Sequence, residues 1–234
     1  MKTPSYRYLD SITALFAVIL VTSNVASSAK IIDMGFSVFG TRLAFDGGTL
    51  LFPLSYIIGD ILTEVYGFKA ARRVIWTGFV CLAVSALLFF ILGRLPPDAT
   101  WESYAGSGAY RAILGGMSSG GIVFASLAAY LLGEFSNSVI LSKMKVMFKG
   151  RYLWVRTIGS SIIGEFLDSL VFVAIATIAG VFSRELFFTL VLTNYLLKLC
   201  LEVIFTPATY LAAGLLKKAE GADVYDDGVK YRLF

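Results

Sequence analysis

Six apolar stretches of about 20 residues each run through this 234-residue chain, and they constrain its fold more than any other feature. A helix needs about 20 apolar residues to cross the hydrocarbon core of a bilayer. Only 15% of the residues are charged, against roughly 25% in an ordinary soluble domain. The sequence therefore predicts an all-α, polytopic membrane helix bundle in one domain, with spans at about 9–30, 49–66, 73–93, 120–142, 157–182 and 187–215.

The first two stretches are the least regular. The first ends in Ser27, Ser28 and Lys30 with no clean small-residue cleavage site, so we expect a retained span and no cleaved signal peptide. The second contains Pro53 and two carboxylates, and we expect it to cross the membrane as a broken or partly re-entrant helix. The Gly- and Pro-containing segment 94–119 is predicted to be an external loop.

Lysines and arginines gather on one side of the predicted bundle. Fourteen lie on the side of the two termini and five on the other, with Lys198 inside the last span. Because cytoplasmic loops of membrane proteins carry the excess of basic residues, we expect both termini in the cytoplasm and the chain in the cytoplasmic (inner) membrane. The net charge of +4 is then explained by topology and contacts with membrane lipids, and we expect no nucleic-acid partner.

The residue inventory excludes several kinds of chemistry. Histidine is absent from the chain, which removes histidine bases, histidine-ligated zinc and serine–histidine–aspartate triads. Cys81 and Cys200 lie far apart inside apolar runs, and no phosphate-binding glycine loop occurs. We therefore expect no enzyme activity, no metal and no cofactor.

Six carboxylates lie inside the predicted spans, each at an insertion cost of roughly 2.5–3.5 kcal/mol at the centre of a membrane helix. Such groups are expected to face a cavity. The spacing of Asp60 and Glu64 places them on one helical face, although both could also lie hydrated near the cytoplasmic interface. Two adjacent like charges resist joint ionisation, so a proton or a ligand is expected beside each pair. The six are Asp60, Glu64, Glu134, Glu165, Asp168 and Glu202.

A short motif recurs in the fourth and fifth spans. Residues 133–138 and 164–169 share the pattern Gly-Glu-Phe-x-(Asn/Asp)-Ser, with a looser copy at 59–64. The repeat is consistent with an internal duplication, and in the predicted topology its copies meet at similar depth, with Asn137 and Asp168 beside the carboxylates. Transporters often place their sites at such repeat interfaces.

Two further spans contribute polar groups. Asn194, Lys198, Glu202 and Thr206 follow one another at intervals of four and form a polar stripe on the last span. Lys198 and Glu202 can pair along this helix, so the stripe either binds a ligand or only neutralises itself. Asn24 in the first span is suited to ligand contact or to a hydrogen bond between helices.

The chain resembles the vitamin-uptake-transporter-like proteins, also called queuosine precursor transporters. The resemblance covers about residues 10–215, and its most specific part is the Asp-x-x-x-Glu-x-Tyr-Gly block at 60–67. Glu165 departs from the family pattern, in which a neutral polar residue is more common. The supporting segments are Ser23–Lys30, Phe52–Gly59, Arg72–Val74, Arg156–Asp168, and Lys198, Glu202, Thr206, Pro207 and Tyr210.

This resemblance implies import of a small-molecule deazapurine, 7-cyano-7-deazaguanine or 7-aminomethyl-7-deazaguanine. The N1–H and 2-amino group of such a base form a two-donor edge that a carboxylate accepts. The candidate acceptors are Asp60, Glu64 and Asp168, while the amides of Asn24, Asn137 and Asn194, or Lys198, can donate to the 6-oxo group. Glu134, Glu165 and Glu202 complete the predicted binding set.

Three classes of function compete at this stage. A secondary carrier, coupled to protons or working by facilitated diffusion, is favoured. A substrate-binding subunit of an energy-coupling-factor importer is second, because such subunits usually present an Ala-x-x-x-Ala face that the alanines of the first span do not form. An intramembrane aspartyl protease fails because its Gly-x-Gly-Asp motif is absent at Asp60. The sequence is compatible with a monomer and with a homodimer.

Overall fold

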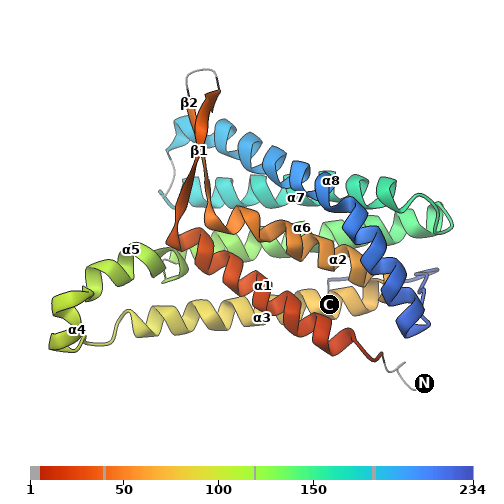
Figure 1. The fold of residues 1–234 in the computed structure, drawn as a ribbon, viewed down its shortest axis with the longest axis horizontal. Coiled ribbons are helices and arrows are strands. Elements are labelled where there is room, and N and C mark those ends of the chain that lie inside the picture. Colours follow the sequence, from red (N-terminus) through yellow and green to blue (C-terminus); the bar gives the residue numbers. More distant parts are fainter. Residues whose placement is uncertain (1–5, 39–40, 119, 181–182, 234) are drawn as a thin grey trace.

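The computed structural model describes residues 6–38, 41–118, 120–180 and 183–233. Six helices in this part of the chain are long and apolar enough to cross a membrane, which confirms the predicted all-α bundle (Figure 1). The end of the fifth predicted span, at 181–182, lies outside the described residues. The long helices are α1 (Leu9–Ala29), α2 (Phe52–Tyr66), α3 (Phe68–Leu92), α6 (Gly120–Met147), α7 (Leu153–Ile178) and α8 (Phe187–Glu220).

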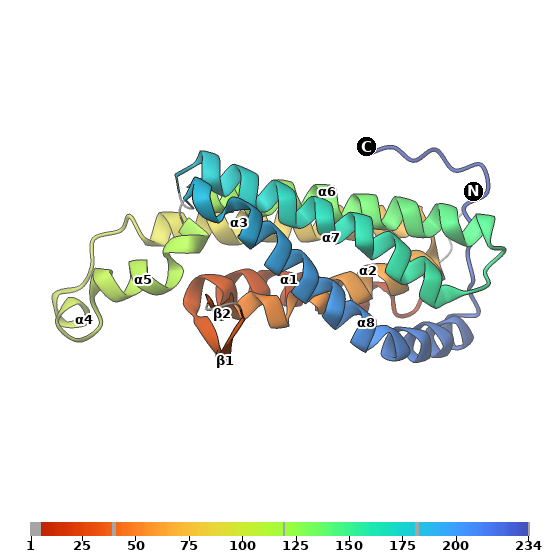
Figure 2. The same cartoon turned by 90° about the horizontal axis from the view of Figure 1, so that it is seen from above.

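The bundle has two distinct ends. The start of α1, the α2–α3 turn and the α6–α7 loop lie at one end, here called the terminal end, and the C-terminal segment runs back across it (Figures 1 and 2). The other end, here called the hairpin end, carries the remaining elements. These are the antiparallel strands β1 (Ile31–Val38) and β2 (Thr41–Asp46), the 3-10 turns η1 (Gly47–Leu50) and η2 (Arg184–Leu186), and the helices α4 (Ala99–Tyr104) and α5 (Gly106–Ser118).

The distribution of side chains is that of a protein dissolved in lipid. Large apolar side chains such as Leu88 on α3 and Ile204 on α8 lie on the outside. Charged side chains such as Asp60, Glu134 and Arg156 are completely buried. Because lipid solvates apolar groups as well as a protein core does, only the polar groups gain from facing inward.

Helix α2 is the most enclosed of the six spans, since 72% of its apolar window is buried. It contacts α1, α3, α6 and α8, so most of its face meets protein and not lipid. This position explains why its sequence was too polar for a simple lipid-facing span. Pro53 lies in the first turn of α2, where a missing N–H costs nothing, so the expected break within the helix is not present.

Helices α6 and α7 cross where the repeated motif places a glycine on each. A Cβ on Gly133 would lie 2.8 Å from the Cβ of Asp168, and a Cβ on Gly164 would lie 2.8 Å from the Cβ of Asn137. The contact is reciprocal in sequence: Gly133 faces Asp168, which lies four residues after Gly164, and Gly164 faces Asn137, which lies four residues after Gly133. This reciprocal contact agrees with the predicted repeat and with copies that meet at one depth.

Two segments differ from their sequence-based expectations. Residues 94–119 were expected to form an external loop, but they contain α4 and α5. Helix α5 packs against α1, where Ser28 donates to the carbonyl of Ile113 (2.7 Å) and accepts from the N–H of Gly116 (3.0 Å). The segment between α1 and α2 forms the β1–β2 hairpin, which the apolar pattern did not indicate.

The C-terminal segment 221–233, here called the tail, packs across the terminal end. Asp226 is buried and accepts from the N–H of Phe68 (2.7 Å) and the hydroxyl of Ser142 (2.6 Å). The N–H of Val224 donates to the carbonyl of Val65 (3.1 Å). The tail therefore closes the α2–α3 turn against α6, whereas its charged composition alone was typical of a mobile end.

Candidate functional site

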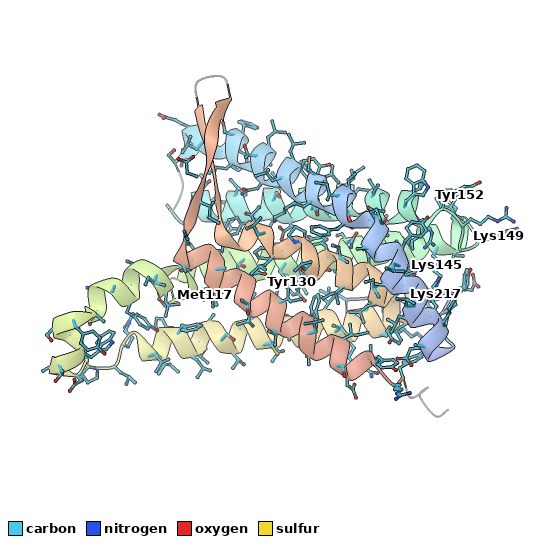
Figure 3. The ribbon with its side chains drawn as sticks, in the orientation of Figure 1. Met117, Tyr130, Lys145, Lys149, Tyr152 and Lys217 are labelled. Carbon is cyan, nitrogen blue, oxygen red and sulfur yellow. The ribbon has the colours of Figure 1, made fainter. Side chains whose placement is uncertain are left out.

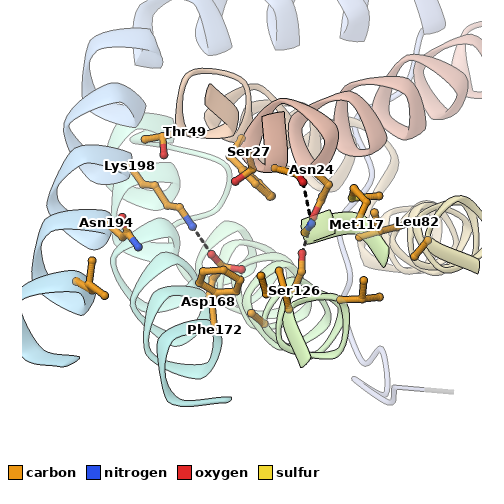
Figure 4. Close-up of a pocket in the computed structure, with 18 residues that line it drawn as sticks. Asn24, Ser27, Thr49, Leu82, Met117, Ser126, Asp168, Phe172, Asn194 and Lys198 are labelled. Atoms are coloured by element: carbon orange, nitrogen blue, oxygen red, sulfur yellow. Dashed lines mark hydrogen bonds and ion pairs between the residues drawn. The ribbon is translucent and has the colours of Figure 1, made fainter. Parts of the chain in front are cut away.

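A cavity of about 500 Å³ lies in the half of the bundle nearer the hairpin end. Small-molecule sites typically occupy roughly 300–1,000 Å³. The cavity is walled by α1, η1, the start of α2, α3, α5, α6, α7 and α8 (Figure 4). Most of its wall is apolar, and its polar groups are Asn24, Ser27, Ser28, Thr49, Ser126, Asp168, Asn194 and Lys198.

The charged part of the cavity wall is an ion pair between α7 and α8. The ammonium group of Lys198 donates to Asp168 Oδ2 and lies 5.2 Å from the centre of the Phe52 ring (Figure 4). Phe172, one turn along α7 from Asp168, adds a second aromatic side chain. A carboxylate, a cation and two rings are the groups that bind a flat, polar heterocycle.

Opposite this pair, α1 and α6 are joined by a hydrogen bond in the cavity wall. The hydroxyl of Ser126 donates to Asn24 Oδ1 (2.6 Å), and Asn24 Nδ2 donates to the carbonyl of Leu20 (2.9 Å). Asn24 therefore makes the hydrogen bond between helices that was one of its two expected roles, and it also lines the cavity, where contact with a ligand stays a prediction. Asn194, one turn before Lys198 on α8, lines the same cavity.

A second group of carboxyls lies beyond the cavity, toward the terminal end. This acidic cluster comprises Asp60 on α2, Glu134 on α6, Glu165 on α7 and Glu202 on α8, and each is completely buried. Asn137 Nδ2 donates to Asp60 Oδ1 (2.7 Å). In the described part of the chain no donor is hydrogen-bonded to Asp60 Oδ2 or to either oxygen of the three glutamates; Ser55 lies beside Glu134, but its hydroxyl donates to the carbonyl of Phe52 (2.7 Å). The side chains of Asp60 and Glu202 are close enough to share a hydrogen bond when one carries a proton.

The backbone of α2 leaves room for this cluster. A Cβ on Gly59 would lie 2.7 Å from Glu134 Oε2, so only glycine lets the carboxyl approach the helix so closely. The Tyr56 hydroxyl lies one turn earlier on α2. It is buried, and it has no hydrogen-bond partner among the described residues. The carboxyl groups of Asp168, Glu134 and Glu165 lie near it. The predicted association of Asp60 and Glu134 is therefore explained by a helix contact at Gly59.

Glu64 does not join the acidic cluster. Its carboxylate accepts from both terminal nitrogens of Arg156 and from Lys217 (2.6 Å), and Lys145 lies 3.9 Å away. The tail residue Asp223 pairs in turn with Lys145 (2.5 Å) and Lys217 (2.9 Å), and Figure 3 shows both lysines at the terminal end. Glu64 is thus part of an ion-pair network that joins α2, α6, α7, α8 and the tail.

The ten predicted site residues therefore divide into three places. Asn24, Asp168, Asn194 and Lys198 line the cavity. Asp60, Glu134, Asn137, Glu165 and Glu202 lie in the acidic cluster. Only Glu64 lies in the terminal network, so Asp60 and Glu64 have different partners although they share a helical face. Lys198 forms its ion pair across to α7, with Asp168, and not along its own helix with Glu202.

Sequence reasoning missed two groups of residues. Arg156 was counted among the fourteen basic residues on the side of the termini, yet it is completely buried within α7 and binds Glu64. Its charge and its place at the start of an apolar stretch gave no signal of a buried partner, because they also fit a basic residue at a membrane interface. Phe52 and Ser126 were missed because single aromatic and hydroxyl residues are too common in membrane helices to stand out.

Within the described part of the chain, no three acidic or cysteine side chains converge closely enough to hold a metal ion. The polar groups of the cavity, an ion pair with amides and hydroxyls, can instead hold an uncharged polar ring by hydrogen bonds.

A family model described as "Putative vitamin uptake transporter" matches residues 46–212. The chain belongs to this family. The match runs from η1 through most of α8, so it includes every element of the cavity wall except α1. Membership of the vitamin uptake transporter family agrees with the expected membrane transporter and with the absence of an enzymatic role.

Curated relatives of this family member carry transporter names. The "Probable queuosine precursor transporter" of Bacillus subtilis (strain 168) is 25% identical over 74% of this chain and 73% of its own length. The "Queuosine precursor transporter" of Escherichia coli (strain K12) is 21% identical over 87% of this chain and 85% of its own length. Another "Probable queuosine precursor transporter", from Haemophilus influenzae, is 25% identical over 69% of this chain and 65% of its own length. No solved structure matches the chain significantly.

Proposed function

We propose that this vitamin uptake transporter family member is a secondary carrier that imports a queuosine precursor, 7-cyano-7-deazaguanine or 7-aminomethyl-7-deazaguanine. The substrate class comes from the names of its relatives. The observation that carries the proposal is the cavity of about 500 Å³ with the Asp168–Lys198 pair in its wall. A bicyclic base fits this volume, and the wall supplies the donors and acceptor that its polar edge requires.

Asp168 is the acceptor for the base in this proposal. Among the three carboxylates considered for that role, Asp168 lines the cavity, whereas Asp60 and Glu64 bind other groups. Its carboxylate accepts the N1–H and the 2-amino group together, as it would a guanidinium. Lys198 then moves to the 6-oxo group, which needs a donor, and the ring stacks on Phe172.

The orientation of the chain in this proposal is argued from its basic residues. Lys145, Arg156 and Lys217 lie at the terminal end, which under the positive-inside rule favours a cytoplasmic terminal end in the inner membrane. The cavity then lies toward the outside, while the tail and the Glu64 network close the cytoplasmic side. In this proposal the structure corresponds to an outward-facing state that is ready to receive substrate.

The test is uptake of labelled 7-cyano-7-deazaguanine into liposomes that contain only this purified chain. Removing a hydrogen bond to a charged group costs roughly 1.5–3 kcal/mol, so Asp168→Asn should weaken binding by about 10- to 100-fold. The charge-balanced double variant Asp168→Asn/Lys198→Gln should bind at least as weakly, because the acceptor is still absent and the cationic donor is also lost. Asp227→Asn, an exposed change in the tail, is the matched control.

Analogues test how the base is read. A 7-deazapurine that lacks the 2-amino group should compete about 10-fold or more less well against wild type, and this penalty should vanish in Asp168→Asn. Full binding by the Asp168→Asn variant would refute the assigned acceptor. Binding by wild type without any uptake would favour the alternative, a substrate-binding subunit that needs an ATP-driven partner.

A further inference from the structure

We infer that the acidic cluster is the proton site of this carrier, separate from the substrate cavity, and that the Asp60–Glu202 pair takes up and releases the transported proton. The inference rests on the proposed carrier function and adds the location of its energy coupling. Its basis is the set of buried carboxyl oxygens that the cavity does not explain.

The first step concerns solvation. Four carboxyls with no exposed surface lie on four neighbouring helices, and among the described residues no donor is hydrogen-bonded to seven of their oxygens. A carboxylate without water, donor or cation is far too costly to bury, and such groups normally take up a proton. Lys198 acts on Glu165 from a distance, but its ion pair is with Asp168. The cluster therefore holds protons in this conformation.

The second step identifies the pair within the cluster. Asp60 is faced by Glu202 from α8, by Glu134 and Asn137 from α6, and by Glu165 from α7. Asn137 Nδ2 occupies one oxygen of Asp60, which leaves Oδ2 for Glu202. A hydrogen bond between two carboxyls needs one proton, and its loss leaves two adjacent negative charges that repel. The proton therefore holds α2 against α8.

The third step joins the cluster to the cavity. Lys198 lies four residues before Glu202 on α8, so the same ammonium can reach Asp168 in the cavity or the carboxyls of the cluster. When the cluster is protonated, Lys198 stays beside Asp168 and can serve the substrate. When the proton leaves, Glu202 and Glu165 attract Lys198, and the cavity loses a donor. Substrate and proton thus favour the same state, as symport requires.

The fourth step follows the proton itself. A hydronium ion in the cavity gives a proton to one oxygen of the Asp60–Glu202 pair. One O–H bond of the hydronium breaks and leaves water, while a new O–H bond forms on the carboxyl and removes one negative charge. After the carrier opens toward the terminal end, the same O–H bond breaks and the proton passes to water on that side. No other reactant takes part, and each cycle moves one proton with one substrate.

The first experiment measures binding of 7-cyano-7-deazaguanine by purified protein between pH 6 and pH 9, together with proton uptake in weak buffer. Wild type should bind about tenfold more weakly for each pH unit above the titration of the cluster, because one proton is linked to binding. Glu202→Gln, which keeps the hydrogen bond to Asp60 without titrating, should bind equally well at every pH. Glu185→Gln, an exposed change at the hairpin end, should behave as wild type.

The second experiment uses liposomes. Glu202→Gln should retain exchange of labelled for unlabelled substrate but lose at least tenfold of the accumulation that an inward proton gradient drives. Exchange that is lost together with accumulation, or accumulation that follows a sodium gradient, would overturn the inference. Wild type that binds no deazapurine would instead refute the proposed function.

Infrared spectroscopy tests the cluster without any substrate. Buried protonated carboxyls give a carbonyl stretch that carboxylates lack, so wild type at neutral pH should show such bands. Part of this signal should disappear in Glu202→Gln and in Asp60→Asn, and none of it in Glu185→Gln. A spectrum with no protonated carboxyl at neutral pH would show that the cluster is ionised and would refute the inference.

Discussion

Removing the carboxylate of Glu64 tests whether this residue is structural or part of the substrate site. Glu64→Gln takes away the partner of Arg156, whose side chain is completely buried. Breaking a buried ion pair on one side costs roughly 3–5 kcal/mol, because the remaining charge stays desolvated. Arg156 keeps hydrogen bonds to the carbonyls of Arg151 (2.9 Å) and Gly150 (3.1 Å), so we expect the lower end, about 3 kcal/mol.

This loss of stability is expected to lower the melting temperature, Tm. In a chain of this size each kcal/mol lowers Tm by roughly 2–4 °C, so Glu64→Gln should lower Tm by about 6–12 °C. The assay is thermal unfolding in lipid nanodiscs, followed by tryptophan fluorescence. Lys217→Met removes a partner that is 25% exposed and should cost at most about 1 kcal/mol. The double variant Glu64→Gln/Arg156→Met should recover most of the loss, because no buried charge remains.

Substrate affinity decides between the two roles. Glu64 does not line the cavity, so Glu64→Gln should bind 7-cyano-7-deazaguanine within about twofold of wild type. A variant that melts like wild type but no longer binds the base would refute this reasoning and return Glu64 to the substrate site.

Two further predictions concern packing and pH. Gly133→Ala should destabilise the bundle by roughly 1–3 kcal/mol, because its Cβ would meet the backbone carbonyl of Gly164 at 3.0 Å; Gly214→Ala, with open space beside it, should instead raise Tm. Burial raises the pKa of Asp223, but hydrogen bonds from its two lysine partners outweigh burial and hold this pKa below the usual 3.8. The stability that Asp223 contributes is therefore present above pH 3.8 and is lost as the pH falls through the lower pKa of the folded state. We expect Asp223→Asn to have a lower Tm than wild type at neutral pH. On acidification its Tm should fall less than that of wild type.

The spans could be predicted from sequence because the bilayer fixes both their length and their apolar character. At α2 the crossing was predicted, but the expected break is absent; the polar residues of this span are explained by its enclosure, because a helix surrounded by protein need not be apolar. The hairpin between α1 and α2, the helix α5 and the packed tail were not predictable in this way. Each depends on contacts with distant residues, such as Ser28 with Gly116 or Asp226 with Phe68, and local composition does not record them.

For the site, sequence identified the buried polar residues but not their partners. Insertion cost marks a carboxylate as functional, yet it does not say which cation or donor meets it. Lys198 has a suitable neighbour at Glu202 along its own helix and another at Asp168 across the bundle, and only the packing of α7 on α8 selects Asp168. In the same way, Arg156 became a partner of Glu64 only when α7 was placed against α2.

The six membrane carboxylates are neutralised in three different ways, and position along the helices explains the difference. Glu64 lies near the terminal end, where the positive-inside pattern supplies Arg156 and Lys217. Asp168 lies beside the cavity and is paired with Lys198. In our proposal a polar ligand takes the place of Lys198 at Asp168 when it binds. Between these positions no loop supplies a cation, so the four carboxyls of the acidic cluster depend on protons in our inference. A carrier must take up its proton on one side of the membrane and release it on the other. Carboxyls that act in this way need a position between the two ends without a permanent cation, since such a cation would make protonation unnecessary.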